Sequence, residues 1–205
     1  MYPKEIEKRS FEIISGELGK TTFRDIELPI VKRVIHTTAD FDFAKNLRFH
    51  PKAVEAGVSA IKNGMDILVD VRMVEAGINK QLLGKWGGKV ICNIAKTEHK
   101  TQTKTERGIE AALKKNKNIG IIAIGNAPTA LFKVLKLLAM YPVSRNPYPV
   151  PLVIGVPVGF VRAVESKEEL SRMKYPFITA LGRKGGSPVA AAIINALLKI
   201  AEEKI

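Results

Sequence analysis

The chain has 205 residues, of which 33 are Lys or Arg and 20 are Asp or Glu, so its formal net charge is +13. Hydrophobic residues make up 46% and charged residues 26%, which is typical of a packed globular protein and excludes a disordered one. The single cysteine, Cys92, excludes a disulfide framework and a multi-cysteine zinc site. No apolar run approaches the roughly 18 residues that a membrane span needs. We therefore expect a cytoplasmic protein with no membrane partner.

The net charge of +13 predicts an anionic partner without identifying it. Aromatic residues make up only 6% of the chain, and no basic arm is present, so the sequence offers no ladder of rings for stacking bases. We expect no nucleic-acid partner, although nucleic-acid binding stays open as an alternative at this point.

The first predicted element is a helix over residues 3–18, because apolar side chains recur along it at helical spacing. Ser10 lies in the middle of this apolar stripe. It is either a core serine that donates a hydrogen bond back to its own helix, or part of a helix face that borders a polar pocket.

His36 ends a β-type run over residues 31–35 and precedes Asp40 and Asp42. We expect it at the end of a strand, where α/β enzymes place catalytic side chains. An imidazole there can exchange a proton near neutral pH. His50 and His99 lie far from it in sequence, and no metal-site spacing links the three histidines.

From residue 50 onward, apolar runs alternate with helical patterns. Strands are predicted at 67–69, 90–94, 119–124, 152–156 and 177–180. Helices are predicted at 50–63, 71–77, 104–115, 127–140, 166–173 and 188–203. Continuous apolar strands alternating with helices indicate a mostly parallel sheet with helices on both faces. We predict a doubly wound α/β fold, one domain over residues 1–205 with an N-terminal helical extension.

Two strand-to-helix turns resemble each other, one at residues 125–130 and one at 185–190. Each sets glycine before an N-cap residue, Asn126 or Ser187, and a proline in the first helical turn. Either turn could present backbone N–H groups to a carboxylate or phosphate at the positive end of its helix. Either could equally be a well-capped helix and nothing more.

Several sequence blocks together resemble the precorrin-8X methylmutase family of cobalamin biosynthesis. They run in the family's order from about residue 5 to residue 200. The blocks are residues 10–14 (SFEII), 33–42 (RVIHTTADFD), 70–78 (DVRMVEAGI), 124–131 (IGNAPTAL), 157–167 (PVGFVRAVESK) and 182–187 (GRKGGS).

The resemblance implies an isomerase that moves a methyl group from C-11 to C-12 of precorrin-8 or its cobalt form, giving hydrogenobyrinate or cobyrinate. It implies that His36 is the proton donor and acceptor, and that Ser10 and Arg33 contact the substrate. It also implies a homodimer. The reaction needs no redox cofactor, and any cobalt belongs to the substrate, so we expect no cofactor and no protein-bound metal.

The substrate carries several carboxylates, which cationic side chains and backbone N–H groups bind well. The further candidates for such contacts are Arg107, Asn126, Arg183, Lys184 and Ser187. A non-catalytic binder of an anionic tetrapyrrole or nucleotide is the alternative function.

Overall fold

The computed structural model describes residues 2–97, 99–140 and 150–203. Its strands form one sheet in the order β1-β6-β5-β4-β2-β3. Only β1 runs antiparallel to its neighbour, β6. The strands are β1 Leu47–Phe49, β2 Asp66–Val69, β3 Val90–Cys92, β4 Ile119–Ile124, β5 Leu152–Gly155 and β6 Phe177–Ala180.

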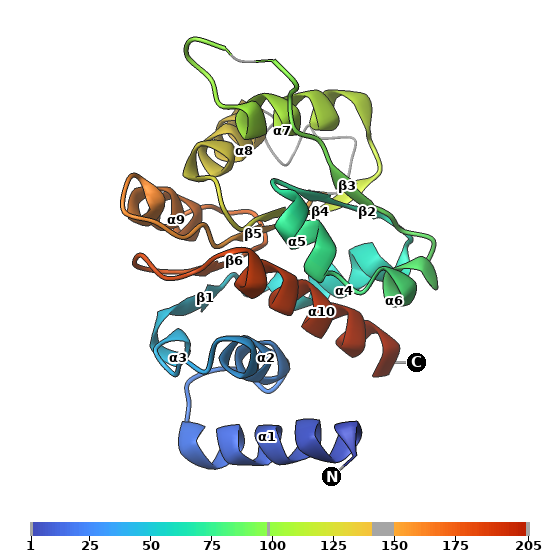
Figure 1. The fold of residues 1–205 in the computed structure, drawn as a ribbon, viewed down its shortest axis with the longest axis vertical. Helices are drawn as coiled ribbons and strands as arrows, with labels where there is room; N and C mark the ends of the chain where they lie inside the picture. The colour runs from blue at the N-terminus through green and yellow to red at the C-terminus, as the bar shows by residue number, and fades with distance from the viewer. Residues whose placement is uncertain (1, 98, 141–149, 204–205) are drawn as a thin grey trace.

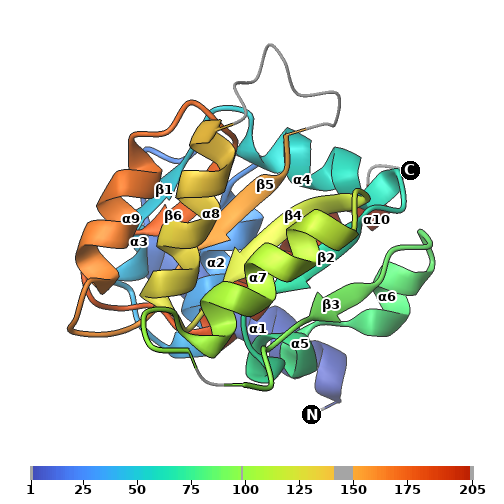
Figure 2. The same ribbon diagram turned by 90° about the horizontal axis from the view of Figure 1, so that it is seen from above.

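The helices cover both faces of the sheet, as predicted for a doubly wound α/β domain. They are α1 Pro3–Leu18, α2 Leu28–Thr38, α3 Phe43–Asn46, α4 Ala53–Lys62, α5 Arg72–Gly77, α6 Lys80–Gly84, α7 Lys104–Lys115, α8 Pro128–Met140, α9 Ala163–Ser171 and α10 Ser187–Glu203. Figures 1 and 2 show α7, α8 and α9 on one face and α2, α4, α5 and α10 on the other.

The two faces contain separate hydrophobic clusters. The larger joins α2, α4 and α10 to the sheet, and the smaller lies under α7, α8 and α9. Strand β4 is buried along its whole length, so its continuous apolar sequence supplies both clusters. The N-terminal helix α1 lies outside this body against α2 (Figure 1), which confirms the predicted extension.

The prediction of a β-run over residues 31–35 was wrong, because this segment is part of helix α2. Pro29 stands in the first turn of α2, where its missing N–H costs nothing. The buried residues are Ile30, Val31, Val34 and Ile35, which is the spacing of one helix face. An alternating strand would instead have buried Arg33 with Val31 and Ile35.

The loop that follows β6 needs glycine for two reasons. Gly186 has a φ of 116°, which side chains other than glycine rarely adopt. A Cβ atom on Gly185 would overlap the backbone oxygen of Val156 at the end of β5. The loop therefore packs directly on the carboxyl end of the sheet.

Candidate active site

His36 lies in the last turn of α2 rather than at the end of a strand, and it is exposed. Its ring stacks on Phe11 of α1, with centroids 5.1 Å apart and an interplanar angle of 15°. The guanidinium carbon of Arg33, one turn earlier, lies 4.7 Å from the centroid of the same Phe11 ring. Phe11 thus holds two predicted site residues side by side, with the imidazole open to a ligand.

Ser10 precedes Phe11 on α1 and is half-buried. Its Oγ donates a hydrogen bond to the backbone oxygen of Ile6, 2.8 Å away. Ser10 therefore makes the hydrogen bond to its own helix that the sequence analysis considered. Ile6 and Ile13, which belong to the same apolar stripe, are nevertheless 51% and 48% exposed. Ser10 consequently borders the surface rather than the core, and its contact with a substrate stays a prediction.

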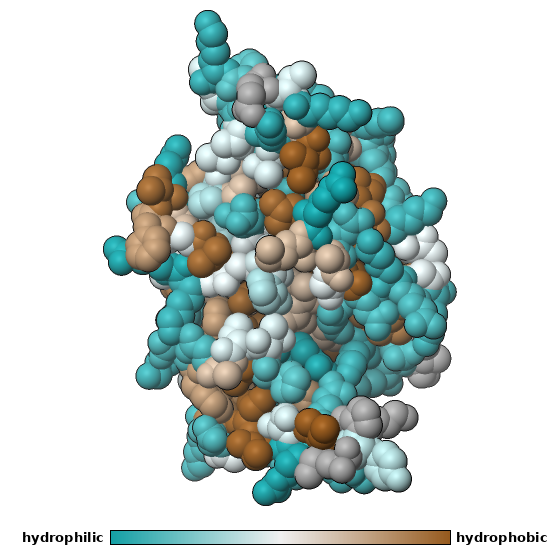
Figure 3. All heavy atoms as spheres, viewed as in Figure 1, coloured by the Kyte–Doolittle hydropathy of each residue, from teal (hydrophilic) through white to brown (hydrophobic). Residues whose placement is uncertain are grey.

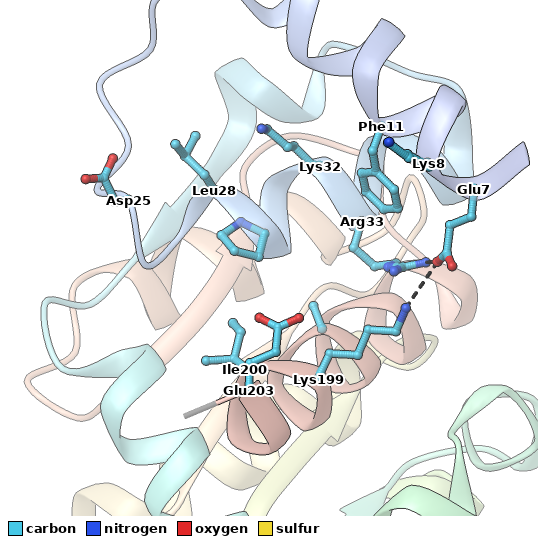
Figure 4. A pocket seen from close by; sticks show the side chains of 12 residues that line it. Glu7, Lys8, Phe11, Asp25, Leu28, Lys32, Arg33, Lys199, Ile200 and Glu203 are labelled. Carbon is cyan, nitrogen blue, oxygen red and sulfur yellow. Dashed lines mark hydrogen bonds and ion pairs between the residues drawn. The ribbon is translucent and has the colours of Figure 1, made fainter. Parts of the chain in front are cut away.

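Arg33 and Lys199 share one carboxylate, that of Glu7 (Figure 4). Arg33 Nη1 lies 2.7 Å from Glu7 Oε1, and Lys199 Nζ lies 3.1 Å from the same oxygen. The hydrogen bond from Arg33 is the largest cause that lowers the pKa of Glu7, so this carboxylate is ionised at neutral pH. Because two cations share one carboxylate, this cluster of three side chains keeps a net charge of +1.

Arg33 and Lys199 line two neighbouring cavities. The cavity of about 590 Å³ between α1, α2 and α10 mixes acids with bases (Figure 4). The cavity of about 470 Å³ between α2, α5, α6 and α10 has no carboxylate among its lining residues, and we call it the cationic cavity. It is lined by Arg33, Thr37, Met73, Gly77, Asn79, Leu82, Ser187, Pro188, Ala191, Ala192, Asn195 and Lys199. Cations beside apolar and amide side chains suit an anionic ligand with an apolar body.

Ser187 begins α10 and lines the cationic cavity, so the structure brings it together with Arg33. It is 6% exposed and lies at the positive end of a 17-residue helix. Both observations agree with its predicted role as a carboxylate contact, and neither tests that role.

The backbone N–H groups at Asn126 are already occupied, which corrects the expectation that they bind a substrate carboxylate. Asp70, at the carboxyl end of β2, is fully buried. It accepts hydrogen bonds from the N–H groups of Gly125, Asn126 and Ala127 at 3.1, 2.8 and 2.8 Å. Burial raises the pKa of Asp70, while these three hydrogen bonds oppose the rise.

Asp70 fills the place where open α/β sheets usually bind ligands. Strands β3 and β4 lie on opposite sides of β2, so the strand order reverses between β2 and β4. The carboxylate of Asp70 takes the position that an external anion would occupy at the start of α8. Any contact of Asn126 with substrate would have to come from its exposed side chain.

Lys184 and Arg183 belong to the glycine-rich loop before α10, and both are exposed. The Nζ of Lys184 is held by Asp40 and Asp42, at 2.6 and 2.7 Å. These pairs raise the pKa of Lys184 and lower that of Asp40. The loop is thereby joined to the segment that follows His36. Arg183 has a different neighbour, because its guanidinium carbon lies 5.2 Å from the ring centroid of Phe160.

Arg107 lies apart from the other predicted site residues. It belongs to α7, on the face of the sheet opposite α2 and α10 (Figure 1). Its Nη1 donates to the backbone oxygen and the hydroxyl of Thr97, at 2.8 and 3.2 Å. The structure does not bring Arg107 to the His36 cluster.

The sequence reasoning missed Glu7, Lys199 and Asp70, and gave no role to Lys167. Lys167 on α9 is fully buried, and its Nζ donates to the backbone oxygen of Lys184 at 2.8 Å. Lys167 lies on the same helix face as the buried Ala163 and Leu170, and this spacing is a usable signal for its burial. No sequence signal distinguishes Lys199 and Glu7, because exposed charged residues are common on amphipathic helices.

The described residues contain no group of three His, Cys, Asp or Glu side chains that could hold a metal ion. Burial raises the pKa of the Cys92 thiol, which disfavours the thiolate form that a nucleophile or metal ligand requires. Among the helices that the structure describes, none is long and apolar enough to cross a membrane.

Comparison with known proteins places this site in a family. The family model for precorrin-8X methylmutase matches residues 5–200. A cobalt-precorrin-8 methylmutase of Priestia megaterium is 43% identical over 99% of this chain and 90% of that protein. A precorrin-8X methylmutase of Pseudomonas aeruginosa is 36% identical over 94% of this chain and 93% of that protein.

The fold agrees with the sequence comparison. The crystal structure of precorrin-8X methylmutase from Thermus thermophilus superposes with a TM-score of 0.85 at 37% identity. The superposition covers 97% of this chain and 98% of the Thermus thermophilus chain. The chain therefore belongs to the precorrin-8X methylmutase family and is an isomerase of corrin biosynthesis.

Proposed function

We propose that this enzyme moves the methyl group on C-11 of precorrin-8, or of its cobalt form, to C-12, and that His36 is its acid/base group. The observation that carries the proposal is the shared Phe11 ring, against which the exposed imidazole of His36 and the guanidinium of Arg33 both lie. Arg33 in turn lines the cationic cavity, which connects the His36 cluster to a site for an anionic ligand. The full-length match to the family supports the substrate.

The methyl shift requires a proton donor and a macrocycle that is bound in a reactive conformation. Protonation of the macrocycle by His36, at a ring nitrogen, withdraws electrons from the conjugated system and lowers the barrier to migration. The same imidazole takes the proton back after the methyl group has moved, so the reaction is redox-neutral. A positioned acid contributes about 10²–10⁴-fold, and holding the ring in a reactive geometry supplies the rest.

The substrate carboxylates are bound, in this proposal, by Arg33, Lys199 and Ser187 in the cationic cavity. Arg33 is the more buried of the two cations, because its side chain is 18% exposed and that of Lys199 is 47% exposed. Less water therefore screens its charge, and we expect it to bind a carboxylate more tightly. Ser10 contributes a hydroxyl from α1. No resident cofactor or metal takes part, and cobalt enters only as part of the substrate.

A homodimer is the second part of the proposal. The half-exposed Ile6 and Ile13 on α1 support it, because an apolar stripe on an outer helix is suited to burial against another chain. Sedimentation velocity of the wild type and of the Ile6→Ser, Ile13→Ser double variant tests it. A monomeric wild type would overturn this part and leave the enzymatic part standing. The single cysteine agrees with a cytoplasmic location, which cell fractionation tests.

The enzymatic part is tested by spectral conversion of precorrin-8 and of cobalt-precorrin-8 by the wild type, by His36→Ala and by His99→Ala as a control. We expect conversion of one or both substrates by the wild type and the control, and a loss of at least 100-fold in His36→Ala. Full activity in His36→Ala would overturn the assigned role. Binding without conversion by the wild type would overturn the proposed reaction.

A further inference from the structure

The loop between β5 and α9 exposes three large apolar side chains to solvent. Val158, Phe160 and Val161 are 47%, 82% and 79% exposed. Apolar residues gather over the loops beside α9 and β6 on the left of the face in Figure 3. We call residues 157–162 the β5–α9 loop. It belongs to one of the sequence blocks that the proposed function leaves without a role.

The β5–α9 loop adjoins the candidate site. The N–H of Gly159 donates to the backbone oxygen of Arg183 at 3.2 Å, and the N–H of Gly186 donates to that of Val156 at 2.8 Å. Val158 lies close beside Gly186. The next residue, Ser187, lines the cationic cavity, so the β5–α9 loop packs against the residue that precedes the cavity lining.

Two arginines flank the apolar side chains. Arg183 lies against the Phe160 ring at 5.2 Å, and the guanidinium carbon of Arg162 lies 4.2 Å from the ring centroid of Phe132. Within the described part of the chain, neither guanidinium has a carboxylate partner. The ring contacts orient both groups while leaving their N–H edges available.

The backbone holds Arg162 in an unusual conformation. Its φ is 61°, in the left-handed region, and Arg162 is one of two residues other than glycine with a positive φ in the described chain. Such a conformation is unfavourable for a residue with a side chain and persists only where the surroundings enforce it. Arg162 also stands as the N-cap of α9, so the turn fixes the direction of the loop.

A corrin precursor has matching chemistry, because it is a conjugated disc with carboxylates on its rim. Drug-sized ligands occupy pockets of about 300–1,000 Å³. The cationic cavity, at about 470 Å³, lies in the lower half of this range, whereas a macrocycle with acetate and propionate arms is larger than a drug-sized ligand. We therefore expect part of the ring to lie on the surface beside the cavity.

We propose that the β5–α9 loop is a binding surface for the outer part of the macrocycle, where Phe160 and Val161 contact its apolar face and Arg162 and Arg183 bind rim carboxylates. This inference rests on the proposed function and assigns a surface to its substrate. The alternative occupant, a second copy of the chain, lacks the surplus carboxylates that two unpaired arginines favour, because the chain is itself cationic at +13.

The experiment measures binding of hydrogenobyrinate and of cobyrinate by absorbance titration, using full-length wild type, Phe160→Ala, Phe160→Leu, Arg162→Met and Arg183→Met. We expect the Kd to rise about tenfold in Phe160→Ala and much less in Phe160→Leu, because leucine keeps most of the apolar area. Each arginine variant is expected to weaken binding and to reduce its dependence on salt. Met140→Ala on α8, where Met140 is 65% exposed, is the matched control and should bind as the wild type does.

Sedimentation at several concentrations accompanies the titrations. A wild-type Kd in Phe160→Ala, with turnover intact, would overturn this inference and leave the proposed function standing. A weaker dimer in Phe160→Ala with unchanged ligand affinity would assign the loop to a second copy and overturn it as well. Failure of the wild type to bind either probe would overturn this inference, and loss of precorrin-8 conversion as well would overturn the proposed function.

Discussion

The Nζ of Lys184 lies 2.6 Å from Oδ2 of Asp40, and this ion pair joins the loop after β6 to the segment after His36. Asp42 accepts from the same ammonium at 2.7 Å. Ala39, between His36 and Asp40, has a left-handed φ of 51° and ends α2. The segment from His36 to Asp42 is therefore held at two points, by Phe11 at His36 and by Lys184 at the two aspartates.

We predict that Lys184→Met lowers kcat/KM about tenfold, because the His36 turn loses one of its two supports and small displacements are costly in catalysis. The double variant Asp40→Asn, Asp42→Asn should give a similar loss. Steady-state kinetics check both, with Lys136→Met on the exposed side of α8 as control. If the double variant keeps full activity while Lys184→Met does not, Lys184 binds the substrate itself.

We predict that Asp70→Asn destabilises the protein by about 2–4 kcal/mol, because an amide replaces one of two oxygens that together accept three buried N–H groups. Urea unfolding measures the change. Asp25→Asn, at an exposed position, should stay within about 0.5 kcal/mol of the wild type. A similarly small change in Asp70→Asn would show that the start of α8 does not need its carboxylate.

We predict that Glu7→Gln lowers KM up to about fivefold at low salt, since Glu7 competes with substrate carboxylates for Arg33 and Lys199 and such pairs contribute up to about 1 kcal/mol. The effect should shrink as salt is added. Glu12→Gln, which removes an exposed pair with Arg9 on the same helix, is the control. A raised KM in Glu7→Gln would instead show that Glu7 holds the two cations in their binding positions.

The sequence predicted the sheet well because its central strands are continuous apolar runs. Both β4 and β6 begin and end where the pattern placed them. The short antiparallel strand β1 was missed, since three residues carry no periodicity. Residues 30–35 of α2 were assigned to a strand because valine and isoleucine dominate them and both have a high β propensity. The spacing of the buried residues is nevertheless that of a helix face.

The sequence predicted part of the site, and the errors in that prediction have a physical cause. Arg33 and His36 lie together because they are one helical turn apart, a relation that survives the error about the strand. The N–H groups at Asn126 looked available because a sequence does not show that Asp70, 56 residues earlier, reaches them. Glu7 and Lys199 meet across 192 residues, so their contact is a product of tertiary structure alone.

Burial lowers the pKa of Lys167 from 10.5 to about 8. Below about pH 8 the folded chain has to hold a buried ammonium whose one described acceptor is the Lys184 carbonyl. Between about pH 8 and 10.5 the unfolded chain keeps this proton while the folded chain has lost it. Unfolding then takes up a proton, so the free energy of unfolding rises with pH across this window.

Lys167→Met removes the titrating group and keeps most of the side-chain volume. The difference in unfolding free energy, wild type minus Lys167→Met, should therefore increase as pH rises from about 8 to about 10. Urea unfolding at several pH values measures it, and the exposed Lys174→Met should show no such trend. A constant difference would mean that Lys167 binds its proton equally in both states, and that the buried amine is better solvated than its surroundings indicate.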